Sequence, residues 1–307
     1  MRAPRICVVG AANIDLISYV LRLPRMGETL HGSRFAMGYG GKGANQAVMA
    51  AKLGGRVSMV TKLGRDVFGE GTLANFREWG VDTEHVTFTD EAASGVAPIA
   101  VDEGGSNAII IVTGANDLLS EEDVERARPA IAAASVLVCQ LEIPVEITIA
   151  ALRVAREEGV TTIFNPAPAR PALPEELYRL SDVLCPNEPE TELLTGRSPE
   201  GDRNARAAAQ ELLGRGAGSV ILTLGERGCL VVTPEEETHV PVEPVEAIDT
   251  TGAGDAFVGS LAYFLAAARP LVDAADRANR IAAISVTGRG TQTSFPTAAE
   301  LPVGVLD

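Results

Sequence analysis

The sequence of 307 residues is poor in aromatic residues, histidine and cysteine. Its three histidines, His31, His85 and His239, lie far apart along the chain, without the spacing of metal ligands. We therefore assign the histidines no function. No G-x-S-x-G elbow and no pairing of cysteine with histidine stands out, so the sequence offers no candidate for covalent catalysis.

The four cysteines include no CxxC pair. Each lies in or beside an apolar, strand-like run: Cys7, Cys139, Cys185 and Cys229. Buried, reduced thiols are typical of that setting. We therefore expect free thiols in a reducing, cytoplasmic environment rather than disulfides.

Long apolar runs and an excess of positive charge are also missing. No run approaches the ~18 apolar residues that a membrane-spanning helix needs, and the run near the N-terminus is too short for a signal peptide. Asp and Glu number 41 against 26 Lys and Arg, a net charge of −15. We expect neither nucleic acid nor a membrane as a partner, because both favour clustered positive charge.

Strand-like and helix-like segments alternate along most of the chain. Strands are predicted at residues 5–10, 56–62, 134–142, 160–165, 182–185 and 218–224, and helices at 42–54, 68–79, 145–159, 253–268 and 271–287. Such alternation predicts an α/β fold with a doubly wound, mainly parallel sheet covered on both faces. Because no repeat or linker divides the chain, residues 1–307 are expected to form a single domain.

Two segments break this alternation, at residues 14–38 and 94–112. The second reads as two strands joined by the turn DEGGSN, which indicates a hairpin. We expect the two segments to form one small β-sheet, a lid over the active site. The apolar run at 108–112 favours a homodimer through this lid. A monomer in which the lid folds over and buries this run is also consistent with the sequence.

The stretch DTTGAGDAF, residues 249–257, opens an apolar helical segment with two glycines and a second carboxylate. Glycine weakens a helix interior by roughly 1 kcal/mol, but it leaves backbone N–H groups bare, and at a helix N-terminus these form an anion site. A carboxylate at that place fits a reaction in which Asp255 takes a proton from a group that attacks a phosphate. Interaction with the helix dipole alone would explain Asp255, but not Gly252 and Gly254.

The stretch GYGGKGANQA, residues 38–47, contains a G-x-G-x-x-G pattern that does not follow the first strand, as a dinucleotide-binding motif would. It is no Walker A loop either, because Gly43 follows Lys42. The glycines still allow close approach to a ligand, while Lys42 supplies a cation and Asn45 an amide. The alternative is a plain glycine-rich loop that caps a helix.

Carboxylates and amides also follow other predicted strands, where open α/β sheets bind ligands. Asn13 and Asp15 follow the first strand and Glu142 a later one, and such groups hold the hydroxyls of a polyol. An Asx turn explains the first pair equally well. Asn187 and Glu190 could hold a hydrated Mg²⁺ near phosphates, or they could only cap a helix.

Together these motifs resemble those of the ribokinase family of ATP-dependent sugar kinases, from about residue 5 to about residue 296. The most specific are GGKGANQAV at 40–48 and DTTGAGDAF at 249–257, and the others follow in the expected order: LPRMGET, NPAPAR, PNEPE, TLGERG and GRGTQTSFP. Their grouping is more similar to the ribose-phosphorylating members than to fructokinases or nucleoside kinases. The resemblance implies a doubly wound sheet with a β-lid, which often pairs between the subunits of a homodimer.

The resemblance also implies binding sites. D-Ribose would contact Asn13, Asp15, Gly41, Lys42, Asn45, Glu142 and Asp255, and ATP would contact Asn187, Thr223, Gly225, Gly228, Gly254 and Asn279. Mg²⁺ would accompany ATP, through water molecules on Asn187 and Glu190. K⁺ would shape the loop beside the active site, several of its ligands being backbone carbonyls: Asp249, Thr251, Ser285, Gly288, Gly290 and Ser294.

By the same resemblance, Asp255 would be the general base that takes the proton of the ribose 5-hydroxyl. The N–H groups of Gly252, Ala253 and Gly254 would stabilise charge on the transferred γ-phosphoryl group, and the products would be D-ribose 5-phosphate and ADP. One alternative is a sibling kinase acting on deoxyribose, fructose or a nucleoside such as adenosine. Another is a catalytically silent sugar-binding or regulatory protein, against which the intact Asp255 argues. The misplaced G-x-G-x-x-G pattern disfavours a nicotinamide-dependent dehydrogenase.

Overall fold

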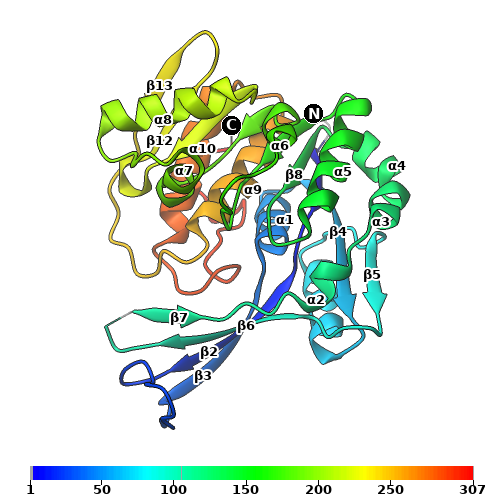
Figure 1. Ribbon diagram of the computed structural model, residues 1–307, viewed down its shortest axis with the longest axis vertical. Helices are drawn as coiled ribbons and strands as arrows, with labels where there is room; N and C mark the ends of the chain where they lie inside the picture. The colour runs from blue at the N-terminus through cyan, green and yellow to red at the C-terminus, as the bar shows by residue number, and fades with distance from the viewer. Residues whose placement is uncertain (1–2, 105, 307) are drawn as a thin grey trace.

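The computed structural model describes residues 3–104 and 106–306. The main sheet contains β1 (Arg5–Val9), β4 (Arg56–Gly64), β5 (Val86–Thr89), β8 (Val136–Cys139), β9 (Thr161–Phe164), β10 (Val183–Leu184), β11 (Ser219–Thr223), β12 (Cys229–Val232) and β13 (Glu237–Val240). Their order across the sheet is β13-β12-β11-β10-β9-β8-β1-β4-β5 (Figure 1). All neighbours are parallel except at β12, which runs antiparallel to both β11 and β13.

Helices cover both faces of this sheet (Figure 1). One face is packed by α1 (Lys42–Lys52), α2 (Val67–Glu78), α9 (Ala253–Ala266) and α10 (Leu271–Ser285). The other is packed by α3 (Glu121–Arg126), α4 (Arg128–Ala133), α5 (Val145–Glu157), α6 (Glu175–Arg179), α7 (Glu188–Thr195) and α8 (Asp202–Gly214). A hydrophobic core lies on each face of the sheet, and successive strand residues point into opposite cores. In β1, Ile6 and Val8 point into one core, and Cys7 and Val9 point into the other. The predicted doubly wound, mainly parallel fold is confirmed.

A second, smaller sheet projects below the main body in Figure 1. It contains β2 (Asn13–Tyr19), β3 (Arg34–Gly40), β6 (Gly95–Val101) and β7 (Asn107–Ile109), in the order β3-β2-β6-β7. The two segments that break the α/β alternation thus meet in one sheet, as predicted, although its central pair, β2 and β6, is parallel rather than antiparallel. Phe35, Met37 and Ile110 on or beside these strands are 63%, 54% and 66% exposed. That this sheet acts as a lid on a single domain stays a prediction.

Several elements differ from the sequence expectations. The strand predicted at 134–142 ends at Cys139, because the chain then turns to other partners: Leu141 N donates to Ala167 O at 3.0 Å, and Thr148 Oγ1 donates to Gln140 O at 3.0 Å. The strands β5, β12 and β13 were not among those predicted, although the run around Cys229 in β12 was noted as strand-like. The sequence of β13 is short and half-exposed and lacks an apolar run. Over the residues that the structure describes, no helix is both long and apolar enough to cross a membrane.

All four cysteines are free and buried, as predicted. Cys7 and Cys139 belong to one core of the sheet, and Cys185 and Cys229 to the other. Burial raises the pKa of the Cys7 thiol and that of the Cys229 thiol to about 12. The thiols are therefore packing groups, protonated at neutral pH.

Candidate active site

The residues predicted to bind the sugar gather beside the carboxyl end of β1. Strand order reverses at β1, with β8 on one side and β4 on the other, and open α/β sheets bind ligands at such a point. The first turn of α1 packs against this strand exit, where Ala44 N donates to Ala11 O at 3.0 Å. A Cβ on Gly43 would lie 2.8 Å from the carbonyl carbon of Gly10, so only glycine permits this approach.

The base candidate Asp255 lies in the first turn of α9. The helix starts at Gly252, whose φ of 81° is in the left-handed region and whose Cβ, if present, would lie 2.5 Å from Thr291 Cγ2. Asp255 is only 6% exposed. Its Oδ2 accepts from Asn45 Nδ2 and its Oδ1 from Gln46 Nε2, each at 2.9 Å. The two most specific sequence motifs therefore meet at this carboxylate.

The Gly-Ala-Gly segment before Asp255 is open at Gly254. A Cβ on Gly254 would meet no heavy atom within 4 Å outside its own helix. The N–H of Ala253 donates to Thr250 O at 3.2 Å. The N–H groups of a first helical turn lack intrahelical acceptors and carry the positive end of the helix dipole. The segment has room and polarity for an anion, but the role of Gly252, Ala253 and Gly254 in phosphoryl transfer stays a prediction.

Lys42 stands among carboxylates at the start of α1. Burial lowers the pKa of Lys42, but the negative charges of three carboxylates, in order of effect Asp255, Glu142 and Glu190, outweigh it and hold the pKa above its ordinary value. The backbone N–H of Lys42 also donates to Glu142 Oε2 at 2.8 Å. Lys42 therefore supplies a permanent positive charge in a site that is otherwise acidic.

Three carboxylates act on one another across the same space. Burial, followed by the charges of Glu142 and Asp255, raises the pKa of Asp15 to about 6. Burial also raises the pKa of Glu142, against the opposing charge and hydrogen bond of Lys42. Carboxylate oxygens accept hydrogen bonds, so this group of buried carboxylates suits the hydroxyl donors of a polyol.

Asn13 and Asp15 follow the first strand, as expected, but they lie in β2 of the small sheet rather than in a loop. The Asp15 carboxylate covers Gly40, on which a Cβ would lie 2.5 Å from both oxygens. Gly41 has a φ of 87°, and a Cβ there would lie 2.7 Å from Asn13 N. Asn13 Oδ1 accepts from Asn116 Nδ2 at 2.9 Å. The predicted sugar ligands Asn13, Asp15, Gly41, Lys42, Asn45, Glu142 and Asp255 are thereby brought together.

The predicted ATP ligands Thr223, Gly225, Gly228 and Asn279 form a second group. Thr223 ends β11, and a turn closed by Leu224 N donating to Gly228 O at 2.8 Å follows it. Asn279 of α10 lies beside this turn, since its Nδ2 donates to Cys229 Sγ at 3.4 Å. Thr223 also bridges to Asn187, the fifth of these ligands. Their contact with a nucleotide stays a prediction.

Asn187 and Glu190 form the N-terminal cap of α7, the alternative that the sequence left open. Asn187 Oδ1 accepts from Glu190 N at 2.8 Å, and Glu190 Oε2 accepts from Asn187 N at 2.9 Å. Burial raises the pKa of Glu190, whose charge acts on Lys42. Among the described residues, no three His, Cys, Asp or Glu side chains are grouped to hold a metal ion. The structure thus shows the capping role, and a Mg²⁺ held through water on these two residues stays a prediction.

The predicted K⁺ ligands lie on two adjoining loops, before α9 and after α10. Asp249 Oδ1 accepts from Thr251 N at 3.0 Å, and its Oδ2 accepts from Gly290 N at 2.9 Å. Burial raises the pKa of Asp249, but these hydrogen bonds outweigh it and hold the pKa below its ordinary value. Gly288 lies against Ser294 and the carbonyl oxygen of Ser285. This set of carboxylate, hydroxyl and carbonyl oxygens suits a hard cation, while K⁺ itself stays a prediction.

The sequence analysis missed three glutamines of the site: Gln46, Gln140 and Gln292. Gln46 is fully buried and contacts Asp255, Gln140 contacts Gln46, and Gln292 contacts Asn45. A signal was present for the first two, because each is an amide inside an apolar run. A buried amide without a partner is costly, so such a residue indicates a hydrogen-bond network.

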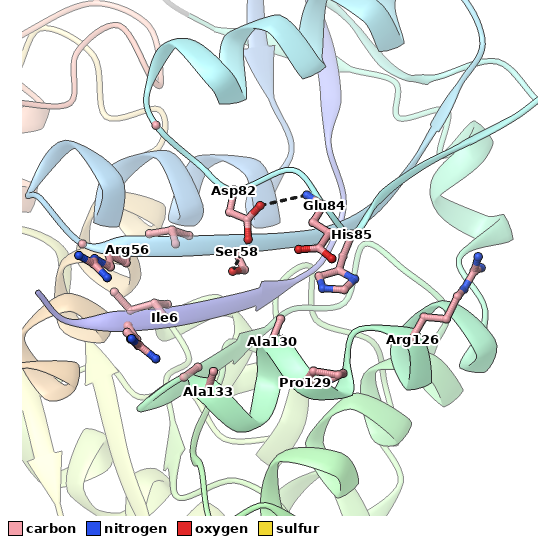
Figure 2. Close-up of a pocket in the computed structure, with 15 residues that line it drawn as sticks. Ile6, Arg56, Ser58, Asp82, Glu84, His85, Arg126, Pro129, Ala130 and Ala133 are labelled. Carbon is pink, nitrogen blue, oxygen red and sulfur yellow. Dashed lines mark hydrogen bonds between the residues drawn. The ribbon is translucent and has the colours of Figure 1, made fainter.

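A groove of about 600 Å³ opens at the other end of the strands, where β1 and β4 begin (Figure 2). Arg5, Arg56, Asp82, His85 and Arg126 are among the residues that line it. None of the predicted sugar, ATP or cation ligands lines this groove. It is therefore separate from the candidate active site.

Comparison with known proteins gives concordant matches. Residues 3–298 match the pfkB family of carbohydrate kinases. The chain is 45% identical to ribokinase of Mus musculus, over 99% of this chain and 95% of the relative. It is 42% identical to deoxyribokinase of Salmonella typhi, over 95% of each. A solved structure of Arabidopsis thaliana ribokinase complexed with ribose and ATP superposes with a TM-score of 0.90 at 30% identity, covering 99% of both chains.

These matches span nearly the whole chain, and their fold is the doubly wound sheet with an added small sheet that the structure shows. The two motifs that meet at Asp255 lie within the matched range. The chain belongs to the pfkB family of carbohydrate kinases.

Proposed function

We propose that this chain is a ribokinase, which transfers the γ-phosphoryl group of ATP to the 5-hydroxyl of D-ribose and forms D-ribose 5-phosphate and ADP. The observation that carries the proposal is the buried Asp255 carboxylate, held by two amides of α1 at the open N-terminus of α9. The 45% identity to mouse ribokinase and the likeness to a ribokinase complexed with ribose and ATP support the choice of sugar.

In the proposed reaction, Asp255 accepts the proton of the 5-hydroxyl as the oxygen attacks the γ-phosphorus. The bond between this phosphorus and the β–γ bridging oxygen breaks, and ADP leaves. The N–H groups at Gly252, Ala253 and Gly254 stabilise negative charge on the transferred group, aided by the helix dipole. Lys42 adds a positive charge on the same side.

The sugar is held by the residues around the β1 exit. Asp15 and Glu142 accept hydrogen bonds from hydroxyl groups, Lys42 donates them, and Asn13 and Asn45 donate or accept them. Gly41 lets the turn before α1 pack against the backbone of residues 11–13, which places its own backbone beside the proposed sugar site. ATP lies along the turn after β11, between Asn187, Thr223, Gly225, Gly228 and Asn279, with its phosphates toward Gly254.

Two cations and a second subunit complete the proposal. Mg²⁺ would neutralise phosphate charge, through water on Asn187 and Glu190. K⁺ on the loops around Asp249 would fix the backbone before α9. The exposed apolar side chains on the small sheet, such as Phe35 and Ile110, support a homodimer through this sheet. The four free thiols support a cytoplasmic location.

Deoxyribokinase is the second candidate, because the chain is 42% identical to such an enzyme of Salmonella typhi over 95% of its length. The two sugars differ by one hydroxyl. A site that hydrogen-bonds a substrate hydroxyl discriminates strongly against the analogue that lacks it, since its own polar groups are left unpaired.

The test is ADP release from ATP with D-ribose, 2-deoxyribose, fructose and adenosine, in K⁺ and in Na⁺, with Asp255→Asn beside the unaltered protein. We expect ribose-selective turnover that K⁺ stimulates, and a fall in kcat by a factor on the order of 10²–10⁴ in the variant. A preference for 2-deoxyribose would select the second candidate. Full activity of Asp255→Asn would refute the role of the base, and no turnover with any of these acceptors would refute a kinase of this substrate range.

A further inference from the structure

Five buried amide side chains form two hydrogen-bonded chains that end on Asp255. They come from α1, α2, the segment after β8 and the loop after α10, and none is more than 6% exposed: Asn45, Gln46, Asn75, Gln140 and Gln292. Burying an amide costs free energy unless it is hydrogen-bonded. Five at one carboxylate are therefore a network rather than ordinary core packing.

The first chain of amides begins on α2. Asn75 Nδ2 donates to Gln292 Oε1 at 2.8 Å, and Gln292 Nε2 donates to Asn45 Oδ1 at 3.0 Å. Asn45 Nδ2 then donates to Asp255 Oδ2 at 2.9 Å. Residues from α2, the loop after α10 and α1 thus reach the carboxylate in sequence.

The second chain of amides begins after β8. Gln140 Nε2 donates to Gln46 Oε1 at 2.6 Å, and Gln46 Nε2 donates to Asp255 Oδ1 at 2.9 Å. Gln46 Nε2 also donates to Asn165 Oδ1 at 3.1 Å. Each carboxylate oxygen of Asp255 therefore receives one amide donor.

Every amide in both chains points its NH₂ group toward Asp255. An ionised carboxylate only accepts hydrogen bonds, so an adjacent amide has to present its nitrogen. The oxygens of Asn45, Gln46 and Gln292 then face away and each takes a donor from the next amide outward. Both chains are thus complementary to an ionised carboxylate at position 255.

We propose that Gln46 and Gln292 are positioning residues that hold the Asp255 carboxylate in the plane needed for proton transfer, Gln46 directly and Gln292 through Asn45. This inference rests on the proposed function, because it needs Asp255 to act as the base. Donors on both oxygens stop rotation of the carboxylate and leave its other lone pairs to the sugar hydroxyl. A base free to rotate would be aligned for only part of the time.

Gln292 is itself fixed by the loop that carries it. Lys52 Nζ donates to Gln292 O at 2.7 Å and to Phe295 O at 2.8 Å, and it lies 4.2 Å from the centre of the Trp79 ring. Gly290, a predicted K⁺ ligand, is on the same loop. The position of this loop is therefore linked through Gln292 and Asn45 to the base.

Gln46→Met and Gln292→Met test the proposal, because methionine keeps the length of the side chain and removes all three amide hydrogen bonds of Gln46 and both of Gln292. Gln210→Met is the matched control: this amide also bonds a carboxylate, Glu237, at 2.7 Å, but on the outside of α8. Each substitution is made alone and in the Asp255→Asn background. The readouts are kcat, the KM of ATP and of the sugar, and the melting temperature.

We expect Gln46→Met to lower kcat by a factor on the order of 10 to 100, and Gln292→Met by a smaller factor of roughly 3 to 10, because it acts through Asn45. The KM of ATP stays unchanged, as does every parameter of Gln210→Met. In the Asp255→Asn background neither glutamine variant lowers the remaining turnover further, since the group that they position is gone.

A merely structural role gives a different pattern. The fall in kcat would then persist undiminished beside Asp255→Asn, or the KM of ATP would rise with it, and either result overturns the proposal. Unchanged kcat in both single variants also overturns it. If one variant fails to fold, the other still decides. Failure of the proposed function is distinguishable, because the unaltered protein would then phosphorylate no sugar in the same assay.

Discussion

Gly41→Ala tests whether the turn between the small sheet and α1 admits only glycine. Gly41 has a φ of 87°, and its Cβ would lie 2.7 Å from Asn13 N, 2.8 Å from Ala12 Cα and 2.9 Å from Ala11 O. All three are backbone atoms, which cannot rotate away as the end of a long side chain can. The first turn of α1 therefore has to move away from the β1 exit.

Two terms give the size of the effect. A left-handed backbone costs alanine roughly 1–2 kcal/mol, and forcing an atom into a packed region costs about 1–3 kcal/mol more. Gly54→Ala is the matched control, because Gly54 has a φ of 91° but nothing within 4 Å of its Cβ. The control should lose only the first term. At roughly 2–4 °C for each kcal/mol, the melting temperature should fall visibly further for Gly41→Ala.

The functional readout is kcat/KM for the sugar. We expect a fall on the order of 10- to 100-fold for Gly41→Ala, because Lys42 and Asn45 move with the turn. Gly54→Ala should keep its full activity. Equal losses of stability in the two variants would refute the steric argument, and full activity of Gly41→Ala would refute the placement of the sugar at this turn.

Three further predictions follow from the charges and surfaces. Burial and neighbouring carboxylates raise the pKa of Asp15 from 3.8 to about 6, so the folded state binds its proton more tightly and loses stability as pH rises from about 4 to about 6. Asp15→Asn should therefore stabilise the fold at pH 7–8 by about 1–3 kcal/mol in thermal unfolding, and it should weaken sugar binding. An equal increase in stability at pH 4 would contradict this explanation. Lys52→Met leaves two buried carbonyl groups unpaired and should lower the free energy of unfolding, measured by urea titration, by about 2–4 kcal/mol. A decrease below about 1 kcal/mol would show instead that water replaces the ammonium group as their donor. Phe35→Glu combined with Ile110→Glu places charges on the exposed small sheet and should convert a dimer into monomers in light scattering, whereas an unchanged dimer would place the interface elsewhere.

Local patterns explain why most elements could be predicted from the sequence. The run after Arg5 is apolar at every position because β1 is covered on both faces, and α1 is predicted because Gly41 and Gly54 bracket an alternation of small and apolar residues. Such features depend on neighbours along the chain. β13 was missed because half of its residues face solvent, so that composition does not distinguish it from a loop.

The contacts of the site lie beyond local patterns. Asn45 and Asp255 are 210 positions apart, and only the resemblance to a known family placed them in one site. Gln292 could not be predicted, because a glutamine in a polar loop has no signature until Asn75 and Asn45 are seen on either side of it. Asn13 and Asp15 were expected at a strand exit, but a strand of the other sheet starts there. Asn13 pairs with Gly40 and Gly95, and Asp15 pairs with Gly38 and Ala97.

The four thiols make the two cores of the main sheet separately observable. Cys7 and Cys139 lie on one face and Cys185 and Cys229 on the other, and none is exposed. An alkylating reagent can reach them only when the covering helices open, because buried, protonated thiols do not react. Peptide mapping of the alkylated sites over time would therefore record whether the two layers of helices detach together or one after the other.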